Sequence, residues 1–153
     1  LLGAQAWVKA HKDKLPKIAN LFNRDGGPEP PVGISVPQAM YDDFVKISEP
    51  IQKIRPDYPF EVKVREPRKR PTRMGGTDAS VFAIEGVPTL GFTTEDFKGY
   101  DFDYGEIWHT ERDLYTKNIP EYQEHTATVT AIIALGVANL DKQLSREGLY
   151  TEE

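Results

Sequence analysis

The histidine best placed for chemistry in this chain is His109, within the segment Trp-His-Thr-Glu-Arg-Asp at positions 108–113. Polar and aromatic residues fill the preceding positions 100–105, and this mixture predicts a loop rather than a helix face or a buried strand. A histidine in such a loop keeps one ring nitrogen free while a carboxylate orients the other, as zinc ligands require. The alternative interpretation is a histidine that only caps its own loop. The chain has 3 histidines, so few residues can bind a metal or transfer a proton through an imidazole.

Two further polar segments share features of a ligand site. Asp25 stands in Asn-Arg-Asp-Gly, and Asp78 ends the segment Gly-Gly-Thr-Asp. These segments and the His109 loop lie where predicted strands end or predicted helices begin, and ligands of open α/β sheets bind beyond the carboxyl ends of the strands. Asp25 and His109 offer a carboxylate oxygen and an imidazole nitrogen, ligands that a catalytic zinc uses. The alternative for Asp25 is a simple turn, since aspartate tolerates turn geometry.

The elements that must position these segments alternate along the chain. Apolar residues at helical spacing predict helices, and short apolar or alternating runs bounded by turn residues predict strands. The expected helices are residues 1–14, 40–55, 80–85 and 118–140, and the expected strands are 17–23, 60–64 and 87–92. Prolines and a glycine at 28–33 predict a loop, and a capping-box pattern at 35–38 precedes the second helix. His125 lies one turn before Val129 on the apolar face of the last helix, which predicts a core histidine.

This order of elements predicts an α/β fold. Short strands that alternate with amphipathic helices are typical of a three-layer sandwich with a mostly parallel sheet. The sequence shows no internal repeat and no second domain, so residues 1–153 are expected to belong to a single domain. A chain of 153 residues with 39% hydrophobic content can bury a core of that kind.

Charge and composition exclude several function classes. A net charge of −5 argues against a surface that binds nucleic acid. No apolar run approaches the length of a membrane span. With 0 cysteines, the chain has no disulfide framework, no thiolate metal site and no cysteine nucleophile.

Three motifs in a fixed order carry a family resemblance. They are Asp25 in Asn-Arg-Asp-Gly, the segment 75–78 followed by Gly-Val-Pro at 86–88, and His109-Thr110 with Asp113. Together they resemble the C-terminal half of the co-catalytic dizinc aminopeptidases, which include bacterial leucyl aminopeptidases and plasma glutamate carboxypeptidase-like enzymes. Leu-Leu-Gly-Ala at 1–4 resembles the segment directly after the Glu-Glu pair of that family. The resemblance covers essentially the whole chain.

The resemblance implies a zinc-dependent exopeptidase of the aminopeptidase or dipeptidase type, acting on peptide substrates through metal-activated water. By motif match, Asp25 ligates one of two zinc ions and His109 ligates the other. The remaining ligands and the general-base glutamate are expected upstream of Leu1, so the chain holds no catalytic residue. The full-length parent is then the enzyme, and this chain alone is an inactive C-terminal portion. The family also implies an extracytoplasmic (secreted or periplasmic) location.

Further residues fit supporting roles around that site. The family often has histidine after the Asp78 motif, where this chain has Ala79. Asp78 therefore either accepts a hydrogen bond from a metal-binding histidine or lies in the first turn of its helix, where negative charge is favourable. Asp113 is expected to support the metal site or the substrate pocket. Trp108 and Tyr104 are expected to wall a substrate side-chain pocket, with simple loop packing as the alternative.

Two other readings of the chain remain open. One is a non-catalytic domain of the same fold that binds peptide or a protein partner, and the other is an α/β domain with coincidental motifs. A domain without its N-terminal half should also expose a strand edge or an apolar patch near Leu21, Val62 and Leu90. Such surfaces recruit partners, so we expect either self-association or derivation from a longer chain whose other half covers them.

Overall fold

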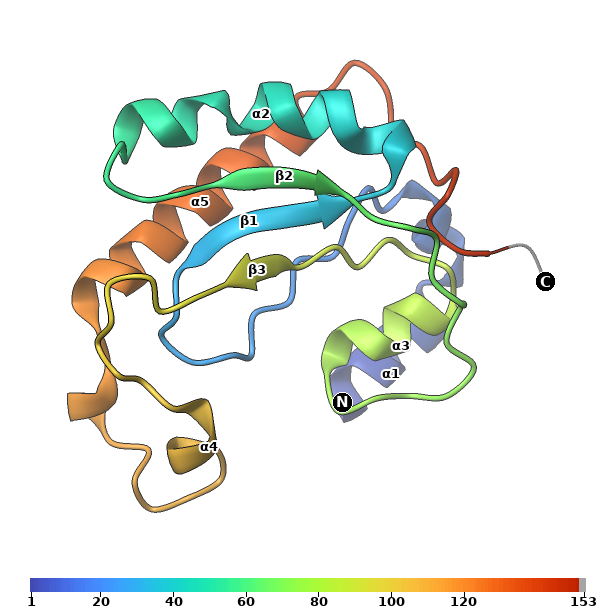
Figure 1. Cartoon of the computed structure of the whole chain (residues 1–153). Coiled ribbons are helices and arrows are strands. Elements are labelled where there is room, and N and C mark those ends of the chain that lie inside the picture. The colour runs from blue at the N-terminus through green and yellow to red at the C-terminus, as the bar shows by residue number, and fades with distance from the viewer. Residues whose placement is uncertain (152–153) are drawn as a thin grey trace.

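The computed structural model describes residues 1–151 and shows a mixed α/β fold (Figure 1). Its α-helices are α1 Leu2–Ala10, α2 Tyr41–Ile54, α3 Asp78–Ile84, α4 Tyr104–Ile107 and α5 Pro120–Ala138. Its strands are β1 Pro31–Val36, β2 Glu61–Val64 and β3 Phe92–Thr94, and its 3-10 turns are η1 Lys12–Lys17, η2 Gln38–Met40 and η3 Tyr115–Lys117. No helix within the described residues combines the length and apolar character needed to cross a membrane.

The three strands form one sheet in the order β2-β1-β3. β1 pairs with β2 in parallel because α2 returns the chain to the same end of the sheet, as a crossover must. β3 runs antiparallel to β1, with Ile34 opposite Phe92. The sheet is therefore mixed, which corrects the prediction of a mostly parallel one.

The main core lies between the sheet and two helices. α2 packs against α5 and β2, and α5 packs against β1. Ile34 of the central strand, Phe44 and Ile51 of α2, and Ile133 of α5 are all at most 1% exposed. Gly136 lets the two helices approach closely, because a Cβ there would lie 2.3 Å from Ile47 Cγ2.

A second apolar cluster joins α1 to α3. Val8 and Leu15 pack with Val81, Phe82 and Val87, and all five side chains are at most 8% exposed. In Figure 1 the two helices lie together beyond the end of the sheet, away from α4. The Gly-Gly-Thr-Asp segment, whose aspartate begins α3, is therefore held with this pair of helices.

Several predicted elements are confirmed. α2 and β2 fall within the predicted helix 40–55 and strand 60–64, and α5 begins with a proline in its first turn, as predicted. α3 starts two residues earlier than expected. The first helix ends at Ala10 instead of continuing to residue 14, and a 3-10 turn containing Pro16 follows.

Three predictions about strands are wrong. Of the predicted strand 87–92 only Phe92 lies in a strand, because β3 begins there. Residues 17–23 form no strand, and are tied to the segment before β3 by the Leu21 amide, which donates to Pro88 O at 2.9 Å, and by the Asn20 side chain. The predicted loop 28–33 instead runs into β1, the central strand. Gly33 belongs in that strand because a Cβ would lie 2.4 Å from the carbonyl oxygen of Glu61 on β2.

Candidate functional site

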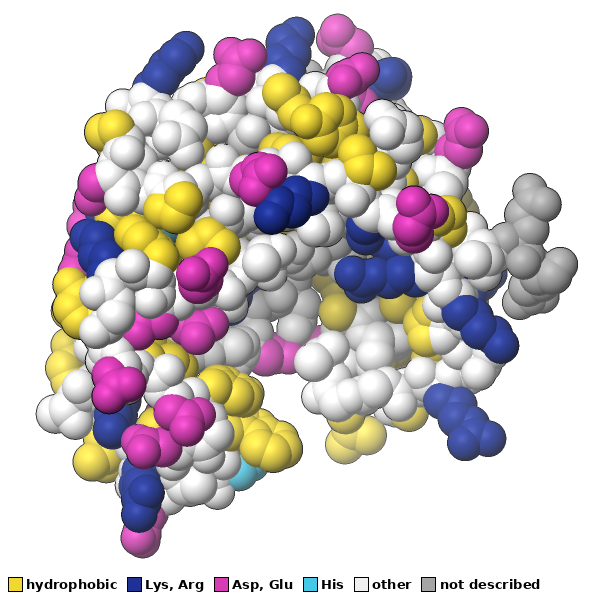
Figure 2. Space-filling view, viewed as in Figure 1, with side chains coloured by type: hydrophobic (Ala, Val, Ile, Leu, Met, Phe, Trp, Pro, Cys, Tyr) yellow, Lys and Arg dark blue, Asp and Glu magenta, His cyan; other side chains and the backbone are white. Residues whose placement is uncertain are grey.

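A large open cleft separates the lobe that carries α4 from the α1–α3 pair. Figure 2 shows the molecule hollowed between these two parts. The cleft has a volume of about 1090 Å³ and is lined by the Asp25 turn, the start of α3, the His109 loop and the first turns of α5. Asp25 and His109 both line it, as the sequence predicts for two residues that share a site.

The turn that carries Asp25 is held by its neighbours. Asn23 Nδ2 donates to Asp25 Oδ2 at 2.7 Å, which orients the carboxylate. The Arg24 guanidinium donates to Gly27 O at 2.7 Å and to Glu29 O, so it closes the turn from the other side. Burial lowers the pKa of Arg24, while the charge of Glu29 opposes that shift. The carboxylate of Asp25 thus accepts from one amide, while the adjacent arginine donates to backbone carbonyls.

The backbone of His109 is in a conformation that non-glycine residues rarely adopt. Its φ is 57°, in the left-handed region, although histidine tolerates that region better than most residues. The Thr110 hydroxyl donates to Glu106 O at 2.8 Å and accepts from the Arg112 amide, and these bonds hold the turn. The His109 ring packs edge-on against Trp108, with centroids 4.8 Å apart. Strained residues of this kind cluster at functional sites.

The imidazole of His109 is exposed to the cleft. Among the hydrogen bonds of residues 1–151, none involves either of its ring nitrogens. Both nitrogens are therefore free for a ligand. Asp113 lines the same cleft, but within the described residues its carboxylate makes no hydrogen bond to the ring.

The Asp25 turn and the His109 loop touch directly. Gly27 lies against Phe102 and Tyr104 so closely that a Cβ would be 2.5 Å from Phe102 Cζ. A glycine is thus required for the two segments to meet at this distance. The sequence offered Asp-Gly-Gly as a turn but gave no sign of this partner, which lies far along the chain.

Both aromatic residues that the sequence proposes for a pocket wall lie on this cleft. Tyr104 and Trp108 line the cleft with their rings stacked, 6.4 Å between centroids and 23° between planes. The side chain of Trp108 is 59% exposed, and Tyr115, which also lines the cleft, is 92% exposed. Small-molecule sites are lined mostly by apolar and aromatic side chains, so these rings are available to contact a ligand.

Asp78 does not line the cleft, although Gly76 and Thr77 just before it do. It is the first residue of α3, and its Oδ1 lies 2.7 Å from the nitrogen of Leu1. This position agrees with the helix-terminus alternative for Asp78.

Sequence reasoning missed the contribution of α5 to the cleft. Gln123 and Thr126 line it from the first turns of this helix, and Lys117 and Asn118 line it just before the helix begins. Gln123 and Thr126 are three residues apart on a helix, so they share a face. That polar spacing, beside the apolar stripe of Val129, was the available signal.

His125 lies outside the cleft and is fully buried, as predicted for a core histidine. Its Nε2 lies 3.0 Å from Pro31 O, so this nitrogen carries the proton and donates. Its ring stacks on Tyr58 at 4.0 Å, and the buried Nδ1 has no hydrogen-bond partner. Burial lowers the pKa of His125, which favours the neutral ring, and His125 is not among the residues that line the cleft.

The donor atoms of the cleft fit part of a zinc site. A carboxylate and an imidazole are suitable ligands, and both lie on the cleft surface. Within residues 1–151, however, no group of three or more histidine, aspartate or glutamate side chains is arranged to hold a metal ion. Because a catalytic zinc usually has three protein ligands, Asp25 and His109 would form only a fraction of a complete centre.

An α/β domain with a carboxylate and a histidine on one open cleft has the elements of a metallohydrolase. Comparison with protein families identifies the family of hydrolases. The model of peptidase family M28 matches residues 1–133. The chain belongs to peptidase family M28, whose members are zinc-dependent peptidases. No curated protein and no solved structure matches the chain significantly.

Proposed function

We propose that this chain is the C-terminal part of a zinc-dependent exopeptidase domain that acts on N-terminal aminoacyl or dipeptide substrates. The observation that carries the proposal is the shared cleft, which Asp25 and His109 both line. Membership of peptidase family M28 supports zinc-dependent peptide hydrolysis as its chemistry.

In this proposal each ligand holds one of two zinc ions. Asn23 keeps one oxygen of Asp25 turned toward it and leaves the other for a metal. His109 offers a ring nitrogen from a turn that Thr110 stabilises. When bound, zinc would lower the pKa of a coordinated water and polarise the scissile carbonyl. Tyr104 and Trp108 would contact the substrate side chain, while Asp113 would support the site from the same loop.

The remaining ligands and the general-base glutamate would come from a segment before Leu1. The nitrogen of Leu1 lies 2.7 Å from Asp78 Oδ1. Gly76 and Thr77, which come directly before Asp78, line the cleft. A Glu-Glu pair directly ahead of Leu1 would thus enter close to the cleft. The same segment would add strands and helices to the mixed sheet and complete a three-layer sandwich, with residues 1–153 as part of one domain.

The decisive experiment compares the longer parent with residues 1–153 alone. The parent should hydrolyse aminoacyl or dipeptide substrates and lose activity with a chelator, and Asp25→Ala or His109→Ala should abolish turnover. His11→Ala is the matched control, because His11 ends α1 and does not line the cleft. Residues 1–153 alone should show no turnover and only weak zinc binding. Robust hydrolysis by residues 1–153 would contradict the proposal, since the general base would then lie within them.

The location of the parent and the self-association of this chain have their own tests. The family resemblance favours an extracytoplasmic location, which cell fractionation of the longer parent measures. Self-association of residues 1–153 rests on the two edge strands β2 and β3 and on the exposed apolar side chains of the cleft. Light scattering with an intact-mass spectrum measures it, and a stable monomer of 17.3 kDa would oppose it.

The alternative is a non-catalytic domain that binds peptide or a protein partner through the same cleft. The exposed rings of Trp108 and Tyr115 favour peptide contact in either case. Peptide binding that survives chelation in a parent without turnover would select this alternative.

A further inference from the structure

The loop that carries His109 is unusually long. It runs from Glu95, just after β3, to Ile119, just before α5, and contains only α4 and η3 as regular structure. A flexible loop of this size has many conformations, and fixing one of them costs entropy. Contacts that join the two ends of the loop therefore decide where His109 lies in the cleft.

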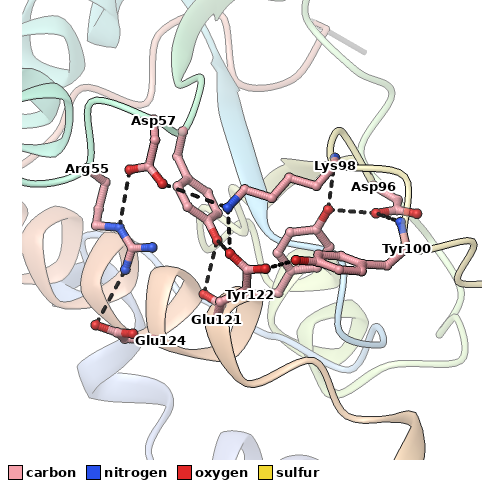
Figure 3. Close-up of polar contacts among 9 residues, drawn as sticks. Arg55, Asp57, Asp96, Lys98, Tyr100, Glu121, Tyr122 and Glu124 are labelled. Atoms are coloured by element: carbon pink, nitrogen blue, oxygen red, sulfur yellow. Dashed lines mark hydrogen bonds and ion pairs between the residues drawn. The ribbon is translucent and has the colours of Figure 1, made fainter.

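The two ends of this loop meet at Lys98 and Glu121. Lys98 Nζ lies 2.5 Å from Glu121 Oε2, and the Tyr58 hydroxyl donates to the same oxygen at 2.9 Å. The Tyr100 hydroxyl donates to the other carboxylate oxygen. Figure 3 shows Lys98 and Tyr100 each reaching a different oxygen of the Glu121 carboxylate. Glu121 lies in the first turn of α5, directly after the loop ends. Its carboxylate thus accepts hydrogen bonds from two residues near the start of the loop.

The next residue of α5 makes a second connection. The Tyr122 hydroxyl donates to Asp96 Oδ1 at 2.6 Å and accepts from the Lys98 amide at 3.0 Å. The same Asp96 oxygen also accepts from the Tyr100 amide at 3.0 Å. Tyr122 is fully buried, so water does not replace these bonds. Consecutive residues of α5 therefore hold the first residues of the loop.

Aromatic packing places the Lys98 ammonium. Tyr58 is fully buried, and its ring has Lys98 Nζ 4.5 Å and Arg55 Cζ 4.4 Å from its centroid. Such cation–π contacts add to the ion pair. The hydrogen bond between Lys98 and Glu121 raises the pKa of the lysine and lowers that of the glutamate, so both groups are charged at neutral pH.

We propose that Lys98 and Glu121 are positioning residues for His109, because their ion pair closes the neck of the loop and sets where the imidazole lies in the cleft. This inference rests on the proposed function, in which His109 binds zinc. Neither residue belongs to the apolar core between the sheet and α2 and α5. Neutralising the pair should therefore loosen the loop and leave the fold in place.

The first test follows amide hydrogen exchange of residues 104–118 in the full chain. Lys98→Met and Glu121→Gln should each speed exchange there by about tenfold, since each removes a charge-assisted hydrogen bond. Lys98→Arg, which keeps the charge, should restore most of the protection. The matched control is Lys12→Met, because Lys12 pairs with Glu85 at 2.8 Å away from the loop.

The second test titrates zinc alone into the same variants while the His109 ring signals are followed by NMR. The zinc dissociation constant should rise about tenfold in Lys98→Met and Glu121→Gln, as it does when support of a ligand is removed. Lys12→Met should bind zinc with the same dissociation constant as the unmutated chain. If the unmutated chain shows no change in its His109 ring signals on adding zinc, the proposed function fails. The hydrogen-exchange test still decides the role of the Lys98–Glu121 pair.

Two results would overturn the inference. One is unchanged exchange at 104–118 in both neutral variants. The other is a uniform rise in exchange that includes α2 and the middle of α5, because the pair would then stabilise the whole fold. Should Lys98→Met fail to fold, Glu121→Gln and Glu121→Asp alter the same ion pair from its other side and provide the comparison.

Discussion

The ring of Phe102 occupies the space where any side chain on Gly27 would have to lie, since a Cβ on Gly27 would be 2.5 Å from Phe102 Cζ. This contact joins the turn of Asp25 to the loop of His109. Gly27→Ala should push the two segments apart and destabilise the chain by about 1–3 kcal/mol, the usual cost of overpacking. Urea unfolding measures the stability, and zinc titration should show weaker binding.

Gly76→Ala is the matched control for that change. Gly76 also lines the cleft, but a Cβ there would meet no atom within 4 Å. Its stability should stay within about 0.5 kcal/mol of the parent chain. If the two alanine variants behaved alike, the contact with Phe102 would not set the spacing of the two segments.

A second prediction concerns the amide that orients Asp25. Asn23→Ala removes the hydrogen bond of 2.7 Å to the carboxylate, so zinc affinity should fall by roughly tenfold. The free energy of unfolding should change by no more than about 0.5 kcal/mol, because the bond lies at the surface. Asn139→Ala, at the end of α5 and outside the cleft, should leave zinc affinity unaltered. Equal affinities in both variants would remove Asn23 from the site.

How far the sequence predicts this fold depends on the distance between interacting residues. The helical spacing of Phe44, Ile47 and Ile51 predicts α2 because that signal is contained within the helix itself. The central strand β1 was missed since Pro31 and Gly33 read locally as loop residues. Only the partner strand shows why they belong there, as the Glu61 carbonyl leaves no room for a Cβ on Gly33.

The same limit applies to the candidate site. Asp25 and His109 were selected from motifs, and the structure brings both to one cleft. The contacts around Glu121 could not be found in this way, because its partners Tyr58, Lys98 and Tyr100 come from two separate segments of the chain. No local pattern encodes a hydrogen-bond network that forms only when loops meet.

The third prediction uses alkaline pH. Burial, with the hydrogen bond to Asp96, raises the pKa of Tyr122 to about 12. Because this value exceeds that of about 10 in the unfolded chain, the stabilisation is complete below pH 10 and is lost as pH rises toward 12. Tyr122→Phe should cost about 1–3 kcal/mol at pH 8 and should lack this part of the alkaline loss. Urea unfolding at pH 8 and pH 11 measures both effects, and parallel losses in the two proteins would contradict the assignment.

Acid pH tests the buried histidine. Burial lowers the pKa of His125 in the folded chain, so the unfolded state binds the proton more readily. Its contribution is therefore complete above the unfolded pKa of about 6.5 and is lost as pH falls from there toward the lower folded value. In His125→Gln, an amide can still donate to Pro31 O, and stability should fall less between pH 7.5 and pH 5.5. A His125 ring signal in NMR that titrates near 6.5 would refute the expected direction.

The backbone of His109 provides the last prediction. At a φ of 57°, glycine is at no steric disadvantage, whereas alanine carries the full cost of the left-handed conformation. His109→Gly should therefore be more stable than His109→Ala by about 1 kcal/mol in urea unfolding. At His11, where φ is −128°, the same two substitutions should show no advantage for glycine. Zinc binding should be lost in both variants at position 109 and retained in both at position 11. If the alanine variant at position 109 were the more stable of the two, the left-handed turn would not be maintained in solution. In the unmutated protein, zinc would then bind the His109 imidazole in another backbone conformation.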